Sequence, residues 1–277
     1  MKTINCKGTR IELSSPKVMG IINITPDSFF DGGTNTTKRA VLLKAEKMLT
    51  EGATFLDVGG YSSRPGAVHI PETEELNRVI PTIEAIVQAF PEAYISIDTF
   101  RSKVAKAAVE SGAAIVNDIS AGKLDINMIS TVAKLKVPYI MMHMKGTPQT
   151  MSQQTDYQNI TKEVLFYFSE RIAEARKAGI NDIIADPGFG FAKTRQQSFT
   201  VLKQLELFKA LDVPILAGLS RKSMIYKTLK TEAEYALNGT TALNSIALLK
   251  GANILRVHDV KEAVECVKLH QEFINLS

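Results

Sequence analysis

Short apolar runs recur along the whole chain, and nearly all of them end in a polar or charged residue. Helix-length stretches with mixed apolar and polar positions separate these runs. Buried strands that alternate with helices indicate an α/β protein with a parallel sheet, and eight of them predict a single (β/α)8 barrel, the TIM-barrel fold. The eight expected strands end at Asn23, Asp57, Asp98, Asp118, His143, Asp186, Gly218 and His258.

Polar strand ends are the first candidates for functional residues, because the active sites of such barrels lie at the C-terminal ends of the strands. A chain of 277 residues fits one barrel, and no shift in composition marks a linker. We therefore expect a single domain over residues 1–277. Within it, residues 1–14 would form an N-terminal extension or a short hairpin that closes the bottom of the barrel.

The main alternative fold is a doubly wound open sheet, which commonly binds nucleotides. That fold usually has fewer strands and often carries a glycine-rich turn after its first strand. The sequence contains neither the GxGxxG pattern nor the GxxxxGK[ST] pattern. The barrel is therefore the preferred interpretation.

Composition narrows the choice of partners. Lys and Arg total 33 against 29 Asp and Glu, a net charge of +4, without a basic block that would bind nucleic acid. Such a mildly positive field suits anionic substrates, although scattered lysines are commonly solvated surface. No apolar run approaches the roughly 20 residues that span a bilayer, and the N-terminus has no signal-peptide pattern. We expect neither a nucleic-acid nor a membrane partner.

The two cysteines indicate a compartment. Cys6 and Cys266 lie at opposite ends of the chain, and neither stands in a CxxC or metal-binding spacing. Free thiols are typical of a reducing environment. The sequence therefore predicts a cytoplasmic protein.

The eighth expected strand carries a strong signal of anion binding. Arg256 and His258 are two residues apart and so face the same side of the sheet, whereas Val257 faces the helices. A buried arginine is rare without an anionic partner, and phosphate is a common ligand near the last strands of a barrel. The alternative is a structural salt bridge from Arg256 to a carboxylate of the barrel, with His258 as a helix cap.

Further polar groups end other strands. Asp98, Asn117 and Asp186 would suit a substrate with several N–H donors, such as the edge of a pterin or a guanine, because a carboxylate can accept two parallel hydrogen bonds. Alternatively, each of them caps the following helix. Lys222, beyond the seventh strand, would bond a ring carbonyl or an anion, or else be solvated. Asn23 offers a neutral oxygen to Mg²⁺ together with phosphate and water, or else stabilises a turn.

Taken together, these segments resemble the signatures of the dihydropteroate synthase family. The similar segments are residues 19–29, 59–67, 97–99, 116–118, 186–191, 220–223 and 256–258. They occur in order over nearly the whole chain. Tyr61 is a departure, because many members of the family have glutamate at this position.

The resemblance implies a transferase of folate biosynthesis and a target of sulfonamides. Such an enzyme joins 4-aminobenzoate to (7,8-dihydropterin-6-yl)methyl diphosphate and gives 7,8-dihydropteroate and diphosphate by a dissociative mechanism. It uses Mg²⁺ as a cofactor and forms a homodimer. The catalytic residues implied by the family pattern are Asn23, Asp98, Lys222, Arg256 and His258.

The same resemblance distributes the binding residues over three subsites. The pterin subsite comprises Asp98, Asn117, Met141, Asp186, Gly218 and Lys222. The diphosphate subsite comprises Asn23, Ser63, Arg64, Arg256 and His258, with Mg²⁺ beside Asn23. The aminobenzoate subsite comprises Phe29, Asp31, Ser63, Arg64, Pro65, Phe191, Lys222 and Ser223.

Two other functions fit part of the pattern. A barrel that transfers a methyl group from methyltetrahydrofolate to a corrinoid protein would share the pterin-binding groups. It would not need the diphosphate-binding groups or the Ser-Arg-Pro-Gly loop at residues 63–66. A non-catalytic pterin- or phosphate-binding protein would not need Lys222 and His258 intact. Both alternatives are therefore less favoured.

Overall fold

Eight parallel strands form a nearly closed barrel in the computed structural model, which describes residues 2–24, 34–62 and 68–275. The strands are β3 (Lys17–Asn23), β4 (Phe55–Gly59), β5 (Tyr94–Asp98), β6 (Ile115–Asp118), β7 (Tyr139–Met142), β8 (Ile183–Asp186), β9 (Leu216–Ala217) and β10 (Ile254–Val257). Their order is β8-β7-β6-β5-β4-β3-β10-β9. A parallel bridge from Ala185 to Ile215 joins the two ends of the sheet. The predicted (β/α)8 barrel is confirmed.

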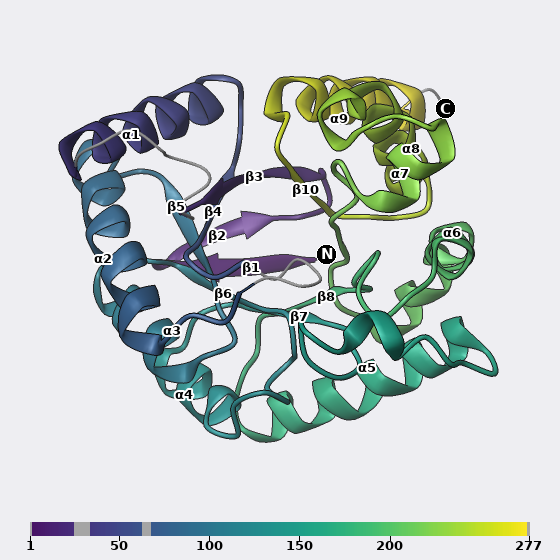
Figure 1. Ribbon diagram of the computed structural model, residues 1–277, viewed down its shortest axis with the longest axis horizontal. Coiled ribbons are helices and arrows are strands. Elements are labelled where there is room, and N and C mark those ends of the chain that lie inside the picture. The colour runs from purple at the N-terminus through teal and green to yellow at the C-terminus, as the bar shows by residue number, and fades with distance from the viewer. Residues whose placement is uncertain (1, 25–33, 63–67, 276–277) are drawn as a thin grey trace.

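Helices surround the barrel on all sides (Figure 1). They are α1 (Thr34–Thr50), α2 (Glu72–Ala89), α3 (Ser102–Glu110), α4 (Met128–Leu135), α5 (Ile160–Lys177), α6 (Arg195–Lys203), α7 (Ser223–Leu229), α8 (Leu237–Leu249) and α9 (Val260–Asn275). Short 3₁₀ turns follow β7, α6 and α7, at Met151–Gln153, Leu205–Leu211 and Ala233–Tyr235.

Local sequence explains where some of these helices begin. The Thr194 hydroxyl accepts a hydrogen bond from the Gln197 amide, and the Gln197 side chain accepts one from the Thr194 amide. This reciprocal pair satisfies two of the amide groups that have no partner within α6. Asn159 caps α5 by accepting from the amide of Lys162.

The alternation of side chains along each strand divides the core into two parts. Residues such as Ile22, Leu56 and Val257 face outward and pack in the core between the barrel and the helices. Residues such as Met19 and Phe55 face inward and pack in a separate core inside the barrel. The polar strand ends lie beyond this inner core, at the C-terminal mouth of the barrel.

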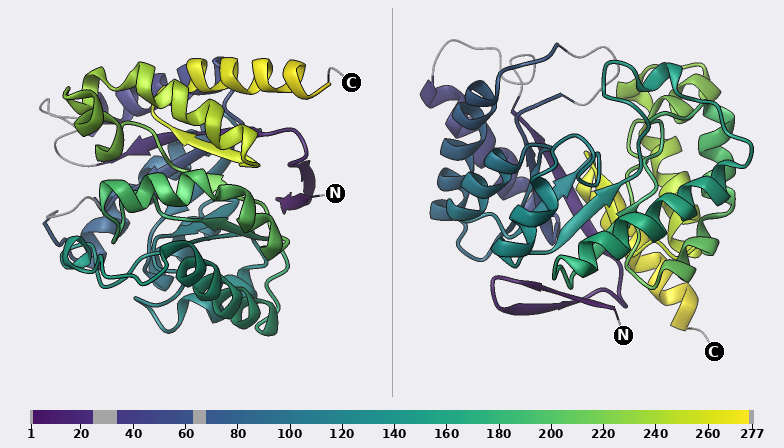
Figure 2. Two further views of the ribbon diagram at one scale, coloured as in Figure 1. Left: turned by 90° about the vertical axis from the view of Figure 1, so that its right-hand side faces the viewer. Right: turned by 90° about the horizontal axis from the view of Figure 1, so that it is seen from below.

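A short antiparallel hairpin closes the opposite, N-terminal end of the barrel. It consists of β1 (Thr3–Cys6) and β2 (Thr9–Glu12), and Figure 2 shows it lying across that end. Its buried residues join the inner core, and they are Ile4, Cys6 and Ile11, followed by Leu13. The expected hairpin is thus confirmed. Because it shares a core with the strands, we propose that residues 1–277 form one domain.

Candidate active site

The strand register brings three predicted residues to one level of the barrel mouth. Asn23 is paired with Gly59, Gly59 with Asp98, and Asp98 with Asn117. Registered residues on neighbouring parallel strands point to the same side of a sheet. Gly59 leaves room at this level, because a Cβ atom there would lie 3.3 Å from the Cβ of Asp98. The ends of β3, β5 and β6 therefore present an amide, a carboxylate and a second amide to one space.

Arg256 lies between two carboxylates. Its Nε donates to Asp57 Oδ2 and its Nη2 donates to Asp98 Oδ2, and both distances are 2.6 Å. The Asn117 side-chain amide also donates to Asp57 Oδ2, at 3.0 Å. The salt bridge that the sequence left open as an alternative for Arg256 is therefore present. It uses two of the five N–H donors of the guanidinium, so it does not exclude an additional anion.

Asp57 also belongs to this cluster. The sequence analysis named it only as the end of an expected strand and assigned it no role. Its side chain is fully buried. Its second oxygen, Oδ1, has no hydrogen-bond partner among the described residues. A charged residue between Leu56 and Val58 in an apolar strand was the available signal, because buried charges require partners.

Burial sets the charge of this cluster. Removal from water raises the pKa of Asp98 to about 7, although Arg256 opposes the rise. Burial lowers the pKa of Arg256, but the charges of Asp57 and Asp98 outweigh this effect and raise it above its usual value. Two carboxylates that share one guanidinium favour retention of a proton as the pH falls towards 7.

The raised pKa of Asp98 predicts a pH-dependent contribution to stability. The folded carboxyl holds a proton that the unfolded carboxyl releases above pH 3.8. The contribution is therefore complete below about pH 4 and is lost as the pH rises through about 7. Relative to Asp98→Asn, the unliganded protein should lose unfolding free energy, on the order of a few kcal/mol, between pH 4 and pH 8. Urea unfolding of both proteins at several pH values measures the difference. A difference that does not vary with pH would contradict the assignment.

Asp186, Gly218, Phe191 and Lys222 form a second part of the mouth. Asp186 Oδ1 accepts a hydrogen bond from the amide of Gly188 at 2.8 Å. A Cβ atom at Gly218 would lie 3.8 Å from Asp186 Oδ2. Lys222 Nζ lies 4.1 Å from the centre of the Phe191 ring. Burial raises the pKa of Asp186, while the Gly188 bond, Lys222 and Arg256 counteract that rise. Ser223 follows Lys222 as the first residue of α7.

His258 is held by Ser220. The Ser220 hydroxyl accepts from the amide of His258 at 3.1 Å and lies 3.0 Å from its Nδ1. Burial, and then the charges of Arg256, Arg221 and Lys44, lower the pKa of His258 to about 3. The imidazole is therefore neutral near pH 7 in the unliganded protein. Because the Ser220 hydroxyl can donate to Nδ1, the proton of the neutral ring is assigned to Nε2.

The prediction for Met141 is wrong. β7 is registered so that Met141 pairs with Asp118 and Ala185, and it packs in the outer core against the helices. Met142 instead pairs with Asp186 and lies on the inward side. Successive residues of a strand face opposite sides. A pterin inside the barrel would therefore contact Met142 rather than Met141.

Five predicted residues lie outside the described part of the chain. They are Phe29, Asp31, Ser63, Arg64 and Pro65. Tyr61, just before the second of these segments, is buried. Its hydroxyl accepts from Gln149 at 2.8 Å and lies 3.3 Å from His69 Nδ1. Tyr61 thus connects the end of β4 with the segment that follows β7.

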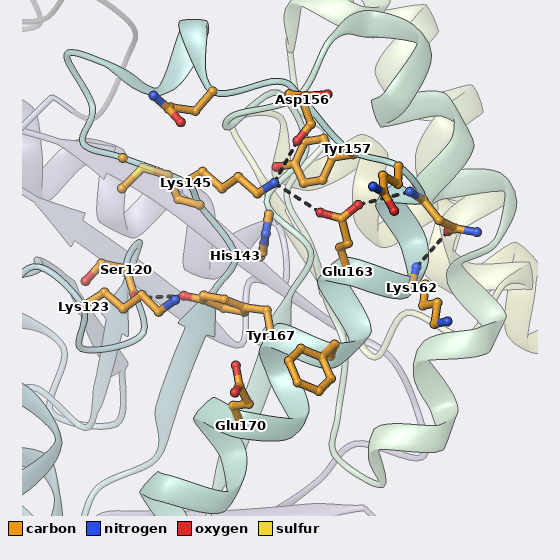
Figure 3. A pocket seen from close by; sticks show the side chains of 16 residues that line it. Ser120, Lys123, His143, Lys145, Asp156, Tyr157, Lys162, Glu163, Tyr167 and Glu170 are labelled. Carbon is orange, nitrogen blue, oxygen red and sulfur yellow. Dashed lines mark hydrogen bonds and ion pairs between the residues drawn. The ribbon is translucent and has the colours of Figure 1, made fainter.

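A cavity of about 950 Å³ lies beside the mouth, between α5 and the segment after β7. His143, Lys145, Tyr157 and Tyr167 are among the residues that line it (Figure 3). None of the predicted catalytic residues lines this cavity. It is therefore distinct from the barrel mouth.

In residues 2–24, 34–62 and 68–275, no helix combines the length and apolar character that a membrane span requires.

Known proteins share both the sequence and the fold. Residues 19–258 match a family described as pterin binding enzyme. Dihydropteroate synthase of Escherichia coli K12 is 43% identical over 265 residues, which cover 95% of this chain and 93% of that protein. Dihydropteroate synthase of Haemophilus influenzae is 42% identical, and the match covers 96% of each chain.

Two solved structures of Xanthomonas albilineans dihydropteroate synthase superpose on nearly the whole chain. One, with 4-aminobenzoic acid, is 40% identical with a TM-score of 0.93 and covers 99% of each chain. The other, with 7,8-dihydropteroate, is 38% identical with a TM-score of 0.89 and covers 99% of this chain and 100% of that one. Sequence and fold agree, and the chain belongs to the dihydropteroate synthase family of pterin-binding enzymes.

Proposed function

We propose that this enzyme joins 4-aminobenzoate to (7,8-dihydropterin-6-yl)methyl diphosphate and releases 7,8-dihydropteroate and diphosphate. The observation that carries this proposal is the group of carboxylates, amides and cations that converges at the barrel mouth around Arg256. The relatives bound to 4-aminobenzoic acid, the proposed substrate, and to 7,8-dihydropteroate, the proposed product, support this reaction.

The pterin would bind between β5, β6 and β8. An ionised carboxylate can accept two parallel N–H bonds, which is what the amino–imine edge of a pterin offers. Asp186 is buried and keeps Oδ2 on the side of Gly218. Asn117 donates its N–H to Asp57, which leaves its side-chain oxygen as an acceptor. Asp98 and Lys222 would complete this subsite, with Met142 in the position first assigned to Met141.

The diphosphate would bind at the end of β10. Arg256 retains three N–H donors beyond those that bond Asp57 and Asp98. His258 presents a neutral ring with its proton on Nε2, as argued from its contact with Ser220. Asn23 lies partly exposed on the neighbouring strand β3. Ser63 and Arg64 remain proposed members of this subsite.

The residues near Asn23 fit Mg²⁺ only if the diphosphate of the substrate supplies further oxygen ligands. In the part of the chain that the structure describes, no three His, Cys, Asp or Glu side chains are grouped to hold a metal ion. Mg²⁺ characteristically takes one or two protein oxygens and completes its shell with phosphates and water. The Asn23 side-chain oxygen suits that mode. When bound, the ion would supply positive charge to the diphosphate.

The residues of the mouth suit a dissociative reaction. As the bond from carbon to the diphosphate oxygen breaks, negative charge grows on the leaving group, where Arg256 and His258 can stabilise it. The pterin becomes cationic at the same time, and the carboxylates of Asp98 and Asp186 would stabilise this positive charge. The neutral amine of 4-aminobenzoate then attacks the cation and forms the C–N bond. The acidic anilinium that results releases one proton to solvent or to the departing diphosphate, so no strong general base is needed.

The aminobenzoate would lie at the outer edge of the mouth. Phe191 and Lys222 are already in contact there, and Ser223 follows at the start of α7. Phe29, Asp31, Ser63, Arg64 and Pro65 are the other residues we propose for this subsite. A Yersinia pestis dihydropteroate synthase structure with a sulfonamide drug has 37% identity, a TM-score of 0.92 and 99% coverage of both chains. Sulfonamides are accordingly proposed to compete at this subsite.

We also propose a homodimer that forms through the last helices. Large apolar side chains are exposed on α7, α8 and α9, and they are Leu229, Ile246, Leu249, Leu269, Phe273 and Ile274. α8 and α9 lie side by side in both Figures 1 and 2. Light scattering would test the dimer. The proposed compartment is the cytoplasm, where the free thiols of Cys6 and Cys266 would remain reduced.

The proposed function is tested by diphosphate release. Purified protein is mixed with Mg²⁺, the dihydropterin diphosphate and 4-aminobenzoate, and diphosphate and dihydropteroate are both measured. Release that depends on 4-aminobenzoate, with dihydropteroate in equal amount, supports the proposal. Pterin binding without any release would contradict it.

His258→Ala should lower kcat by about 10²-fold, because one preorganised donor to the leaving group is lost. Circular dichroism should remain unchanged, since a partly exposed side chain is removed. Ser220→Ala should give a smaller loss, because it removes only the partner that orients the ring. His270→Ala, on α9, is the matched control and should retain full activity. Equal activity of the His258 and His270 variants would refute the role of His258.

A further inference from the structure

Lys193 is a buried lysine to which no role at the site has been given. It lies in the segment between β8 and α6, immediately before the helix cap Thr194. Only 7% of the residue is exposed, and lysine is almost never buried to this extent unless its charge is paired or bonded. A buried ammonium is costly, so its contacts need a reason.

The Lys193 ammonium joins two segments of the barrel mouth. Nζ lies 2.8 Å from Nδ1 of His143, at the end of β7. It also donates to the carbonyl oxygens of Gly188 at 3.0 Å and Phe191 at 3.1 Å. An ammonium has three N–H donors, and Nζ shares them among these three acceptors and, at 3.5 Å, the carbonyl oxygen of His143. Lys193 therefore fastens the turn at residues 188–191 to β7.

The fit between this turn and β7 is close. Gly188 has a φ of +69°, and a Cβ atom there would lie 2.2 Å from the carbonyl oxygen of His143. Only glycine fits both restrictions. The rings of Tyr157 and Tyr167 pack against the His143 ring, with centres 6.2 and 4.8 Å away, and Figure 3 shows all three side chains at the neighbouring cavity. His143 is thus a fixed anchor for Lys193.

The same turn holds two groups that we assign to the pterin. The Gly188 amide donates to Asp186 Oδ1 at 2.8 Å. The Phe191 ring lies 4.1 Å from Lys222 Nζ. A displacement of the turn would therefore move both the carboxylate and the ammonium of this subsite. Burial lowers the pKa of Lys193 to about 7. The charge of Asp186 opposes this shift, and the charges of Lys222 and Lys145 add to it.

We propose that Lys193 is a positioning residue for the pterin subsite. By bonding Gly188, Phe191 and His143, it holds the turn at residues 188–191 so that Asp186 and Lys222 face the substrate together. This inference rests on the proposed function, because it requires that the pterin binds to Asp186 and Lys222. The diphosphate end, at Arg256 and His258, does not depend on Lys193.

The test compares two ligands in one variant. Lys193→Met keeps a long unbranched side chain but removes the charge and every donor. We expect its Kd for 6-hydroxymethylpterin to rise at least about 10-fold, since small misplacements at a site carry large costs. The Kd for inorganic diphosphate with Mg²⁺ should stay within about twofold of the wild-type value. Calorimetry measures both constants. Lys123→Met, near the same cavity, is the control and should change neither.

Each other outcome has a defined meaning. An unchanged Kd for the pterin would overturn the inference. An equal rise of the Kd for the pterin and the Kd for diphosphate would also overturn it, because Lys193 would then have only a general structural role. If Lys193→Met does not fold, His143→Phe removes one of the three acceptors and should weaken pterin binding selectively, by a smaller factor. Absence of that selectivity would also overturn the inference. Failure of the wild-type protein to bind the pterin would instead refute the proposed function, and this inference with it.

Discussion

Asp186→Asn is expected to weaken pterin binding by at least about 10³-fold. The substitution changes mainly one atom. Asparagine can keep its Oδ1 on the Gly188 amide, as Asp186 does at 2.8 Å. The nitrogen then replaces Oδ2, the oxygen on the side of Gly218. A donor would thus face the N–H donors of the pterin, and two charge-assisted bonds would be lost inside a buried site.

This variant should remain folded. Burial raises the pKa of Asp186, which means that the folded protein disfavours its charge. A neutral amide of the same shape removes that cost, so the melting temperature should be unchanged or higher. Calorimetry with 6-hydroxymethylpterin and thermal unfolding measure the two effects separately.

Asp182→Asn is the matched control, because Asp182 lies just before the other end of β8 and accepts from the amide of Asn5. It should bind the pterin as the wild-type protein does. If the two variants bind equally well, Asp186 is not the pterin carboxylate. If both bind poorly, the effect reflects the stability of β8 rather than the site.

The sequence was sufficient to predict the barrel, because eight apolar runs alternate with helix-length segments and most end in polar residues. It was not sufficient to predict which side of every strand faces inward. β7 reads Tyr139–Met142 and is apolar throughout, so it lacks the alternation that would mark its inner face. Met141 and Met142 were therefore indistinguishable until the register with Asp118 and Asp186 placed Met142 inside.

The partners of charged residues were also beyond the sequence. Arg256 and Asp57 are 199 positions apart, so only the closed barrel brings them together. The sequence offered a phosphate and a carboxylate as competing partners for Arg256. The structure shows the carboxylates of Asp57 and Asp98, and the donors left over keep the phosphate compatible with them. Lys193 was missed because nothing in its neighbourhood in the sequence distinguishes a buried lysine from a solvated one.

Arg256→Met is expected to lower kcat/KM by more than about 10³-fold and the unfolding free energy by about 3–5 kcal/mol. The two effects have different origins. Activity falls because the donors to the diphosphate are lost. Stability falls because Asp57, fully buried, and Asp98, 13% exposed, lose the guanidinium between them. Urea unfolding and the diphosphate-release assay measure them independently.

A second substitution separates these two roles. The double variant Asp57→Asn/Arg256→Met replaces one of the two carboxylates left without a partner by a neutral amide. Much of the lost stability should therefore return. Turnover should not return, because no donor to the leaving group has been restored. Lys106→Met, in an exposed ion pair with Glu110 on α3, is the control and should change stability by no more than about 0.5 kcal/mol. Recovery of activity along with stability in the double variant would mean that Arg256 only balances charge in the barrel, and the diphosphate would then have to be bound by His258 and Asn23 without it.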